Sequence, residues 1–256
     1  MIEAARAAAR RLVRDFGEVE NLQVSRKGPA DFVSTADKKA EEIIREHLEK
    51  KRPGYGFIME EGGVVEGTDK THKFIIDPLD GTLNFLHGIP HFSISIGLER
   101  EDELRAGVVF DPMRNELFWA ETGEGAWLDN RRLKVAARRK LTECVVTTGI
   151  PQLGVSGWDT FLDEMITVRH EVAAIRRLGS AALDLSWVAA GRFDAYWERN
   201  LQPWDVAAGF VIVREAAGVI APLNKDDLVK GFVAGNPSIA PKLAERILGK
   251  VPGKKG

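Results

Sequence analysis

Two aspartates three positions apart, Asp77 and Asp80, stand directly after the short apolar run 74–76. That run is rich in β-branched residues and predicts a buried strand, which delivers both carboxylates to its carboxyl end, where open α/β sheets tend to place ligands. Neighbouring carboxylates are costly unless a cation or donors balance them, and such oxygen ligands suit Mg²⁺. Gly81 and Thr82 follow, and their backbone N–H groups would face a phosphate if they open a helix. The pattern therefore indicates a cation site beside a phosphate.

The same stretch also fits a simple turn. Asp77 is followed by Pro78 and Asp80 by Gly81, and both dipeptides are common in turns. Either dipeptide alone would favour the turn interpretation. Their combination at the end of a strand favours the metal interpretation, because it concentrates two negative charges in one place.

Other acids in the chain each have an ordinary structural explanation. Asp205 precedes a predicted helix over 206–217 and can act as its N-cap. Asp37 falls in the first turn of another predicted helix, where the dipole favours an acid. Glu60 and Glu61 follow a short strand, and acids in that place are ordinarily just exposed. From the residues alone, these structural explanations are the preferred ones.

Two stretches of the chain resemble the signatures of the inositol monophosphatase family. The first is Asp77-Pro78-Leu79-Asp80-Gly81-Thr82 with Asn84-Phe85 behind it, and the second is Trp204-Asp205-Val206-Ala207-Ala208-Gly209 followed by Glu215-Ala216-Ala217-Gly218. Many members have two glycines where this chain has Ala217-Gly218, a departure that leaves the helix end intact. The resemblance extends over about residues 5–248. It implies a Mg²⁺-dependent, lithium-sensitive phosphatase of small phosphorylated metabolites.

The resemblance implies a set of metal ligands and catalytic groups. Two or three Mg²⁺ ions per site would be held by Glu60, Asp77, the backbone carbonyl of Leu79, Asp80 and Asp205, with Asp37 completing a weaker third site. These ions would neutralise the phosphate and clamp the attacking and leaving oxygens in line. Thr82, oriented by Asp37, and Glu60 would direct or deprotonate the attacking water. Attack by water predicts that no phosphoenzyme forms, and Li⁺ is expected to inhibit.

The resemblance also implies which residues contact the substrate. They are Asp80, Gly81, Thr82, Gly179, Ser180, Ala181, Glu198, Asp205, Arg177 and Lys27. Gly179 and Ser180 are equally well explained as a helix stop and cap, and Arg177 as a partner in a salt bridge. Lys27 would be a mobile basic group near the phosphate, although the loop from Lys27 to Asp31 is one residue shorter than in some members.

Hydrolysis of a small phosphomonoester is the activity that the resemblance implies. Inositol 1-phosphate is the leading substrate, because the stretch from Trp197 to Asp205 resembles bacterial inositol monophosphatases more than the nucleotidase branch. Relatives on the same scaffold act on fructose 1,6-bisphosphate, 3′-phosphoadenosine 5′-phosphate or histidinol phosphate, and fold does not decide among them. A hypothesis of another class is a regulatory or binding protein with secondary catalysis. The complete set of carboxylates at the expected metal positions favours the enzyme.

Periodicity and turn signals predict an α+β or α/β protein in two halves. Residues 1–135 form an N-terminal α+β half that begins with an amphipathic helix over 2–16, contains an antiparallel sheet and carries most metal ligands. Residues 136–256 alternate strands and helices, which suggests a parallel α/β half carrying Asp205 and the substrate-side residues. The resemblance implies a layered α-β-α-β-α sandwich with the metals between the halves, and a homodimer.

Composition argues against several other classes of protein. The 256-residue chain has a formal net charge of -2, so it has no excess of basic residues for binding nucleic acid and no polybasic membrane patch. No uncharged apolar run reaches the ~18 residues of a membrane span, and the N-terminus shows no apolar signal segment. The single cysteine, Cys144, lies in an apolar run and fits a buried position in a reducing compartment. We therefore expect a soluble, cytoplasmic protein with no direct nucleic-acid or membrane partner.

Overall fold

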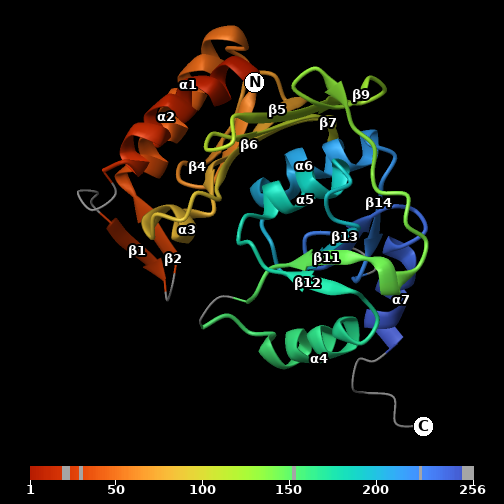
Figure 1. Ribbon diagram of the computed structural model, residues 1–256. Coiled ribbons are helices and arrows are strands. Elements are labelled where there is room, and N and C mark those ends of the chain that lie inside the picture. Colours follow the sequence, from red (N-terminus) through yellow and green to blue (C-terminus); the bar gives the residue numbers. More distant parts are fainter. Residues whose placement is uncertain (19–23, 29–30, 152–153, 225–226, 250–256) are drawn as a thin grey trace.

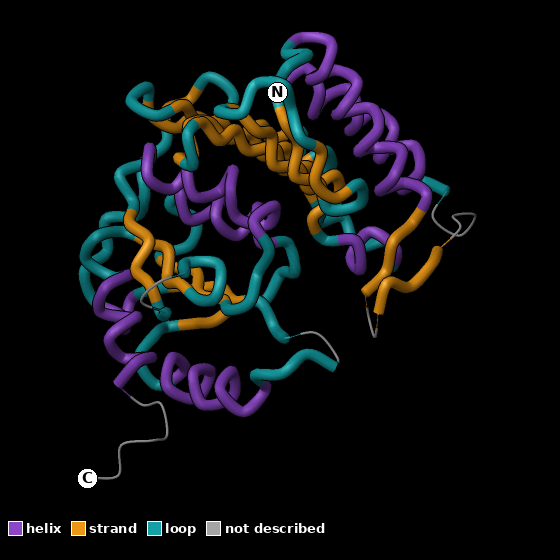
Figure 2. The backbone as a smooth tube through the Cα atoms, turned by 180° about the vertical axis from the view of Figure 1, so that it is seen from behind, coloured by secondary structure: helices purple, strands orange, loops and turns teal. Residues whose placement is uncertain are grey.

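Five alternating layers of helices and sheets make up the structure, a computed structural model (Figure 1). It describes residues 1–18, 24–28, 31–151, 154–224 and 227–249, and for 24–28 and 31–34 it describes the backbone alone. The order is two helices, an eight-stranded sheet, two helices, a five-stranded sheet and two outer helices, which Figure 2 shows from behind. The predicted α-β-α-β-α sandwich is therefore confirmed.

The first layer consists of helices α1 (Ile2–Phe16) and α2 (Thr35–Lys51), which pack against each other and cover one face of the large sheet. An apolar stripe rich in alanine allows this close packing, and Ala5, Ala8 and Leu12 are fully buried. The antiparallel hairpin of β1 (Val24–Gly28) and β2 (Asp31–Ser34) stands between the two helices in the chain and lies beyond their ends in space (Figure 1). The predicted helix over 2–16 is confirmed in its bounds.

The large sheet has the strand order β10-β9-β8-β7-β6-β5-β3-β4. All its pairs are antiparallel except β3 with β5, so the predicted antiparallel sheet is confirmed with one parallel pair. Its strands are β3 (Gly56–Met59), β4 (Gly63–Val65), β5 (His72–Asp80), β6 (Ser93–Arg100), β7 (Glu103–Asp111), β8 (Glu116–Glu121), β9 (Gly125–Leu128) and β10 (Arg131–Arg132). The central strand β5 ends on the two predicted metal-binding aspartates.

The small sheet has the strand order β12-β11-β13-β15-β14. Only β11 with β12 and β11 with β13 are parallel, whereas β15 runs antiparallel to both of its neighbours. The expectation of a parallel second half is therefore wrong for β15, which runs against the other four strands. In the element order β15 follows β14 without an intervening helix, whereas a parallel pair needs a long crossover connection. The strands are β11 (Val145–Thr148), β12 (Ala174–Arg176), β13 (Ala195–Glu198), β14 (Val219–Pro222) and β15 (Phe232–Gly235), and helices α4 (Trp158–Arg169) and α7 (Ala240–Gly249) cover the outer face.

The middle layer consists of α5 (Ala181–Ala189) and α6 (Pro203–Glu215), which contact strands of both sheets. Both helices are apolar on nearly every side, as a helix buried between two layers must be. Helix α6 approaches the large sheet closely because two strand residues are glycines: a Cβ at Gly107 would lie 2.4 Å from the Ala208 carbonyl oxygen, and one at Gly97 2.8 Å from the Ala207 Cβ. The division at residue 135 stays a prediction.

Candidate active site

A cavity of about 390 Å³ lies where the large sheet meets the middle layer, beside the ends of β5 and β13. The carboxyl end of β5 and the first turns of α3 (Thr82–Leu86), α5 and α6 all contribute to it. The structure brings these predicted site residues to its lining: Glu60, Asp77, Leu79, Asp80, Gly81, Thr82, Arg177, Gly179, Ser180, Ala181, Glu198 and Asp205. Asp37 is buried behind the lining, and the side chain of Lys27 lies outside the described residues.

The structure confirms the turn interpretation of the signature, and the metal interpretation stays a prediction. The backbone N–H of Leu79 donates a 2.9 Å hydrogen bond to Asp77 Oδ1, which is turn chemistry, and the β5–β6 register shifts between Asp77 and Asp80. The bulge allows both aspartates to be buried at one end of the strand, with 2% and 8% of their surfaces exposed. The turn is therefore what brings the two carboxylates together.

Acidic side chains outnumber basic ones in the described lining of this cavity, where six carboxyl groups stand against the guanidinium of Arg177. Burial first, and then the charges of Glu60, Asp80 and Asp205, raise the pKa of Asp77 well above its usual range. A hydrogen bond between the Glu60 and Asp77 side chains raises the pKa of Asp77 further. An all-oxygen set of donors with surplus negative charge fits a hard divalent cation such as Mg²⁺.

The acids share the cavity without forming a closed ligand cage. Among the described residues, no three or more His, Cys, Asp or Glu side chains already stand in an arrangement that could hold a metal ion. The charges that raise the pKa of Asp77 nevertheless show that Glu60, Asp80 and Asp205 are its close neighbours. Metal binding by these carboxylates therefore stays a prediction, which their positions along one cavity permit.

Asp205 lies in the first turn of α6 and takes part in capping it. The helix begins at Pro203, three residues before the predicted start, so Asp205 is its third residue rather than its N-cap. The backbone N–H of Gln202 donates a 2.7 Å hydrogen bond to Asp205 Oδ2. Burial raises the pKa of Asp205 well above its usual range, and the charges of Asp80 and Glu60 act in the same direction. The cap uses Oδ2, so capping and metal binding do not compete for Oδ1.

Asp80 joins the large sheet to the first turn of α5. Its Oδ2 accepts hydrogen bonds from Ser180 Oγ at 2.5 Å and from the backbone N–H of Ala182 at 2.8 Å, and its Oδ1 accepts one from the Ala181 N–H at 3.2 Å. These donors lower the pKa of Asp80, although burial raises it more. The expected contact of Ser180 and Ala181 with substrate hydroxyls stays a prediction, and here both residues also bind an aspartate about 100 positions away in the chain. No signal in the sequence predicts this contact.

Thr82 and Asp37 form the predicted pair. Thr82 Oγ1 lies 3.1 Å from Asp37 Oδ1 and 3.0 Å from the Leu79 carbonyl oxygen, and so its hydroxyl has two alternative acceptors. Gly81 precedes Thr82 with a φ of 98°, a left-handed conformation in which a Cβ would also lie 3.1 Å from the His91 carbonyl oxygen. Glycine is therefore required for this turn into the short helix α3.

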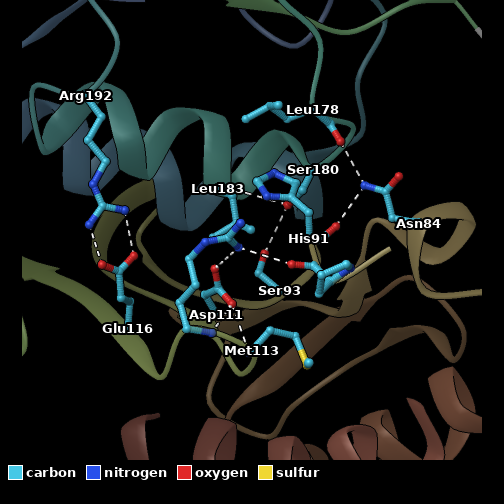
Figure 3. A network of polar contacts seen from close by, with 12 residues as sticks. Asn84, His91, Ser93, Asp111, Met113, Glu116, Leu178, Ser180, Leu183 and Arg192 are labelled. Carbon is cyan, nitrogen blue, oxygen red and sulfur yellow. Dashed lines mark hydrogen bonds and ion pairs between the residues drawn. The ribbon is translucent and has the colours of Figure 1, made fainter. Parts of the chain in front are cut away.

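Asn84 is a site residue whose contacts were not predicted. Its Nδ2 donates 2.8 Å hydrogen bonds to the carbonyl oxygens of His91 and Leu178, and it thereby ties α3 to the loop that leads into α5 (Figure 3). This side chain fixes Gly179 and Ser180 relative to the signature turn. Its place in the signature was noted, but its two partners lie in separate loops.

Replacing Asn84 by alanine is expected to destabilise the protein, because two carbonyl oxygens would lose a common donor. The expected loss is about 2 kcal/mol in the free energy of unfolding. Thermal unfolding followed by circular dichroism should show a Tm lower by about 4–8 °C. Asn130→Ala, an exposed asparagine in the turn between β9 and β10, is the control and should leave Tm unchanged. Equal Tm values for both variants would contradict the assignment.

Glu198 ends β13 and lines the same cavity as the acids of the two signatures. The Tyr196 hydroxyl donates a hydrogen bond to Glu198 Oε2, and the Gly149 N–H donates another to the same carboxyl group. Burial raises the pKa of Glu198 to about 7, and the Tyr196 hydrogen bond opposes this shift. Gly149, Tyr196 and Asp184, which also lines the cavity, were not predicted from the sequence.

A side chain at position 149 would displace Glu198. A Cβ on Gly149 would lie 1.8 Å from Glu198 Oε1, which is far inside van der Waals contact. We expect Gly149→Ala to reduce kcat/KM by about 10-fold or more, because a carboxylate held out of place loses its hydrogen bond to substrate. Steady-state kinetics test this. Gly249→Ala, where a Cβ meets nothing within 4 Å, is the matched control, and an equal effect of both changes would refute the expectation.

Comparison with known proteins agrees with the geometry of this cavity. The model of the Inositol monophosphatase family matches residues 1–253. The chain belongs to this family. An Inositol-1-monophosphatase of Caulobacter vibrioides is 56% identical over 253 residues, which cover 96% of this chain and 99% of that relative. The resemblance seen in the signatures is thereby confirmed, and the chain is a phosphoric monoester hydrolase of the inositol monophosphatase type.

Two further relatives of this chain carry another kind of name. The crystal structure of extragenic suppressor protein suhB from Bartonella henselae shares 52% identity and a TM-score of 0.95, with 98% of each chain covered. Nus factor SuhB of Escherichia coli K12 is 41% identical over 241 residues, which cover 93% of this chain and 90% of that protein. Within the described residues, no helix is long and apolar enough to cross a membrane.

Proposed function

We propose that this protein hydrolyses inositol 1-phosphate to inositol and phosphate with the help of Mg²⁺. The observation that carries the proposal is that one cavity is lined by two kinds of acidic group. Glu60, Asp77, Asp80 and Asp205 form a cluster, here called the acidic end, that suits a cation and a phosphate, and Glu198, which the Tyr196 hydroxyl holds, belongs to a second group, here called the polyol end, that suits hydroxyl groups. A phosphorylated polyol has the same two kinds of group.

Each residue at the acidic end has a separate task in this mechanism. Glu60, Asp77, Asp80, Asp205 and the carbonyl oxygen of Leu79 would hold two Mg²⁺ ions, and Asp37 a third. When bound, Mg²⁺ supplies positive charge that neutralises the phosphate and makes a water molecule more acidic. The Thr82 hydroxyl, held by Asp37, would orient the attacking water, and Glu60 would accept its proton.

The polyol end would recognise the leaving group. Glu198 is held by Tyr196 and by the Gly149 N–H, so its carboxyl group is oriented before the substrate arrives. Arg177 also lines the cavity and is a further polar group for the substrate. The relatives named Inositol-1-monophosphatase at 54–56% identity support inositol 1-phosphate over the other esters. Fructose 1,6-bisphosphate, 3′-phosphoadenosine 5′-phosphate and histidinol phosphate are the alternatives.

Phosphate release from these four esters, measured with Mg²⁺ present, tests the choice of substrate. We expect the highest kcat/KM for inositol 1-phosphate and inhibition of that reaction by Li⁺. A higher kcat/KM for another ester would leave the assignment of the active site intact and would identify that ester as the preferred substrate. No release from any of the four, with Mg²⁺ shown to bind, would refute the proposed activity.

A second candidate function is a regulatory or binding role beside catalysis. It is supported by the relative named Nus factor SuhB, at 41% identity. Purification of the chain from its own cells would test it, because a stoichiometric protein partner together with negligible turnover would favour the binding role. We also propose a homodimer in the cytoplasm, which size-exclusion chromatography with light scattering and cell fractionation would check.

A further inference from the structure

Asp184 is a buried acid in the cavity that the proposed mechanism does not use. It lies one helical turn into α5, only 2% of its surface is exposed, and it lines the cavity together with Glu198 and Arg177. It belongs neither to the family signatures quoted above nor to the acidic end that would hold the cations. Its position therefore needs an explanation of its own.

One oxygen of Asp184 has no hydrogen-bond donor. Among the described residues, Asp184 Oδ1 is one of four buried side-chain polar atoms without a partner. A buried carboxyl oxygen is ordinarily satisfied, because leaving it without a donor costs free energy. By contrast, the buried carboxyl group of Asp194 accepts hydrogen bonds from Arg138 and from the Val145 N–H. The donor that Asp184 lacks is expected to come from what occupies the cavity.

The surroundings of Asp184 fit a hydroxyl group better than a cation. Burial first, and then the charges of Glu198 and Asp80, raise the pKa of Asp184 well above its usual range, whereas the hydroxyl of Thr147 and the guanidinium of Arg177 act in the opposite direction. Arg177, the one basic residue among the described residues that line the cavity, is close enough to Asp184 for its positive charge to act on that carboxyl group. Hydroxyl groups can donate to one carboxyl group and accept from a neighbouring donor.

We propose that Asp184 is a specificity-determining residue that accepts a hydrogen bond from a hydroxyl of the leaving group, beside Glu198. This inference rests on the proposed function, since it concerns the polyol end of the same cavity. It adds a second carboxyl group at that end. Adjacent hydroxyls of one polyol ring can then be held at two points, and a phosphate ester without hydroxyls gains nothing from Asp184.

Kinetics on two substrates test the proposal with the full-length enzyme and Mg²⁺. Inositol 1-phosphate carries the hydroxyls, and p-nitrophenyl phosphate is a phosphomonoester without them. We expect Asp184→Leu, which removes the acceptor and keeps the size, to raise KM for inositol 1-phosphate about 10-fold, as the loss of a hydrogen bond to a charged group does. KM for p-nitrophenyl phosphate should stay within about 2-fold, because that ester offers Asp184 no hydroxyl.

Two further variants separate recognition from folding. Asp184→Asn keeps an oxygen acceptor, so its KM for inositol 1-phosphate is expected within about 3-fold of the wild type. Asp15→Asn neutralises a buried acid of α1, which is 4% exposed and paired with Arg11, and should change neither KM. Circular dichroism shows whether each variant is folded. If Asp184→Leu is unfolded, Asp184→Ala is measured in its place, and the ratio of its KM for inositol 1-phosphate to its KM for p-nitrophenyl phosphate is compared with that of the wild type.

Different results of this experiment would contradict the inference about Asp184 and the proposed function. A wild type that prefers the inositol ester, with the same preference in folded Asp184→Leu or Asp184→Ala, overturns the role of Asp184 and keeps the function. Equal KM increases on both substrates also overturn it, since a structural role would affect both. A wild type without any preference for the inositol ester contradicts the proposed function and the inference together.

Discussion

Asp80→Asn is expected to lower kcat by about 10³-fold, because it removes negative charge from the acidic end of the cavity, where a bound cation is worth several kcal/mol to the transition state. The amide keeps the size of the side chain but cannot replace a carboxylate as a ligand of a hard cation. Single-turnover measurements at saturating inositol 1-phosphate report the chemical step directly.

Asp80 also binds the first turn of α5, so a control must separate the two roles. Ser180→Ala removes the 2.5 Å hydrogen bond from Ser180 Oγ and leaves the Ala181 and Ala182 N–H donors in place. We expect it to lower kcat by less than about 10-fold, as the loss of a neutral hydrogen bond does. If Asp80→Asn retained kcat within a few-fold of the wild type, the assignment of Asp80 as a metal ligand would be wrong.

Asp77→Asn should make the metal-free protein more stable and abolish its response to Mg²⁺. The carboxylate of Asp77 is buried beside three other acids, and the amide removes that repulsion while keeping an oxygen for the Leu79 N–H. We expect a gain of about 2 kcal/mol in the free energy of unfolding. The corresponding rise in Tm is roughly 5 °C. Differential scanning calorimetry in chelator and in Mg²⁺ measures both effects.

Asp194→Asn is the matched control for this change. Asp194 is equally buried, but Arg138 and the Val145 N–H compensate its charge. Its amide variant should therefore be less stable than the wild type and should keep the stabilisation by Mg²⁺. The result that would contradict the account is an Asp77→Asn protein that Mg²⁺ stabilises as strongly as it stabilises the wild type.

Local patterns in the sequence were enough to predict several parts of the fold. The alanine-rich stripe of α1 and the apolar run of β5 are local signals, and both elements form as expected. The earlier start of α6 also had a signal, since Pro203 is favoured in the first turn of a helix. The antiparallel position of β15 had none, because strand order depends on pairing between distant segments.

The candidate site likewise contains residues that local sequence signals predict and contacts that they do not predict. Asp77, Asp80 and Asp205 could be found because the signature places them at the end of a strand or the start of a helix. The Asp80–Ser180 hydrogen bond joins residues 100 positions apart, and nothing local to either residue indicates it. Asp184 looked like an ordinary residue of an apolar helix, and its burial beside the cavity emerges only when α5 is packed between two sheets.

Phosphate release before and after return of the metal tests the central claim most directly. The enzyme is stripped with a chelator, inositol 1-phosphate is added, and Mg²⁺ is then titrated back into the wild type and into Asp80→Asn. The account predicts no release from the stripped enzyme, full recovery of the wild type and no recovery of the variant. A stripped enzyme that hydrolyses the ester at its full rate, or a variant that Mg²⁺ restores as well as the wild type, would contradict it.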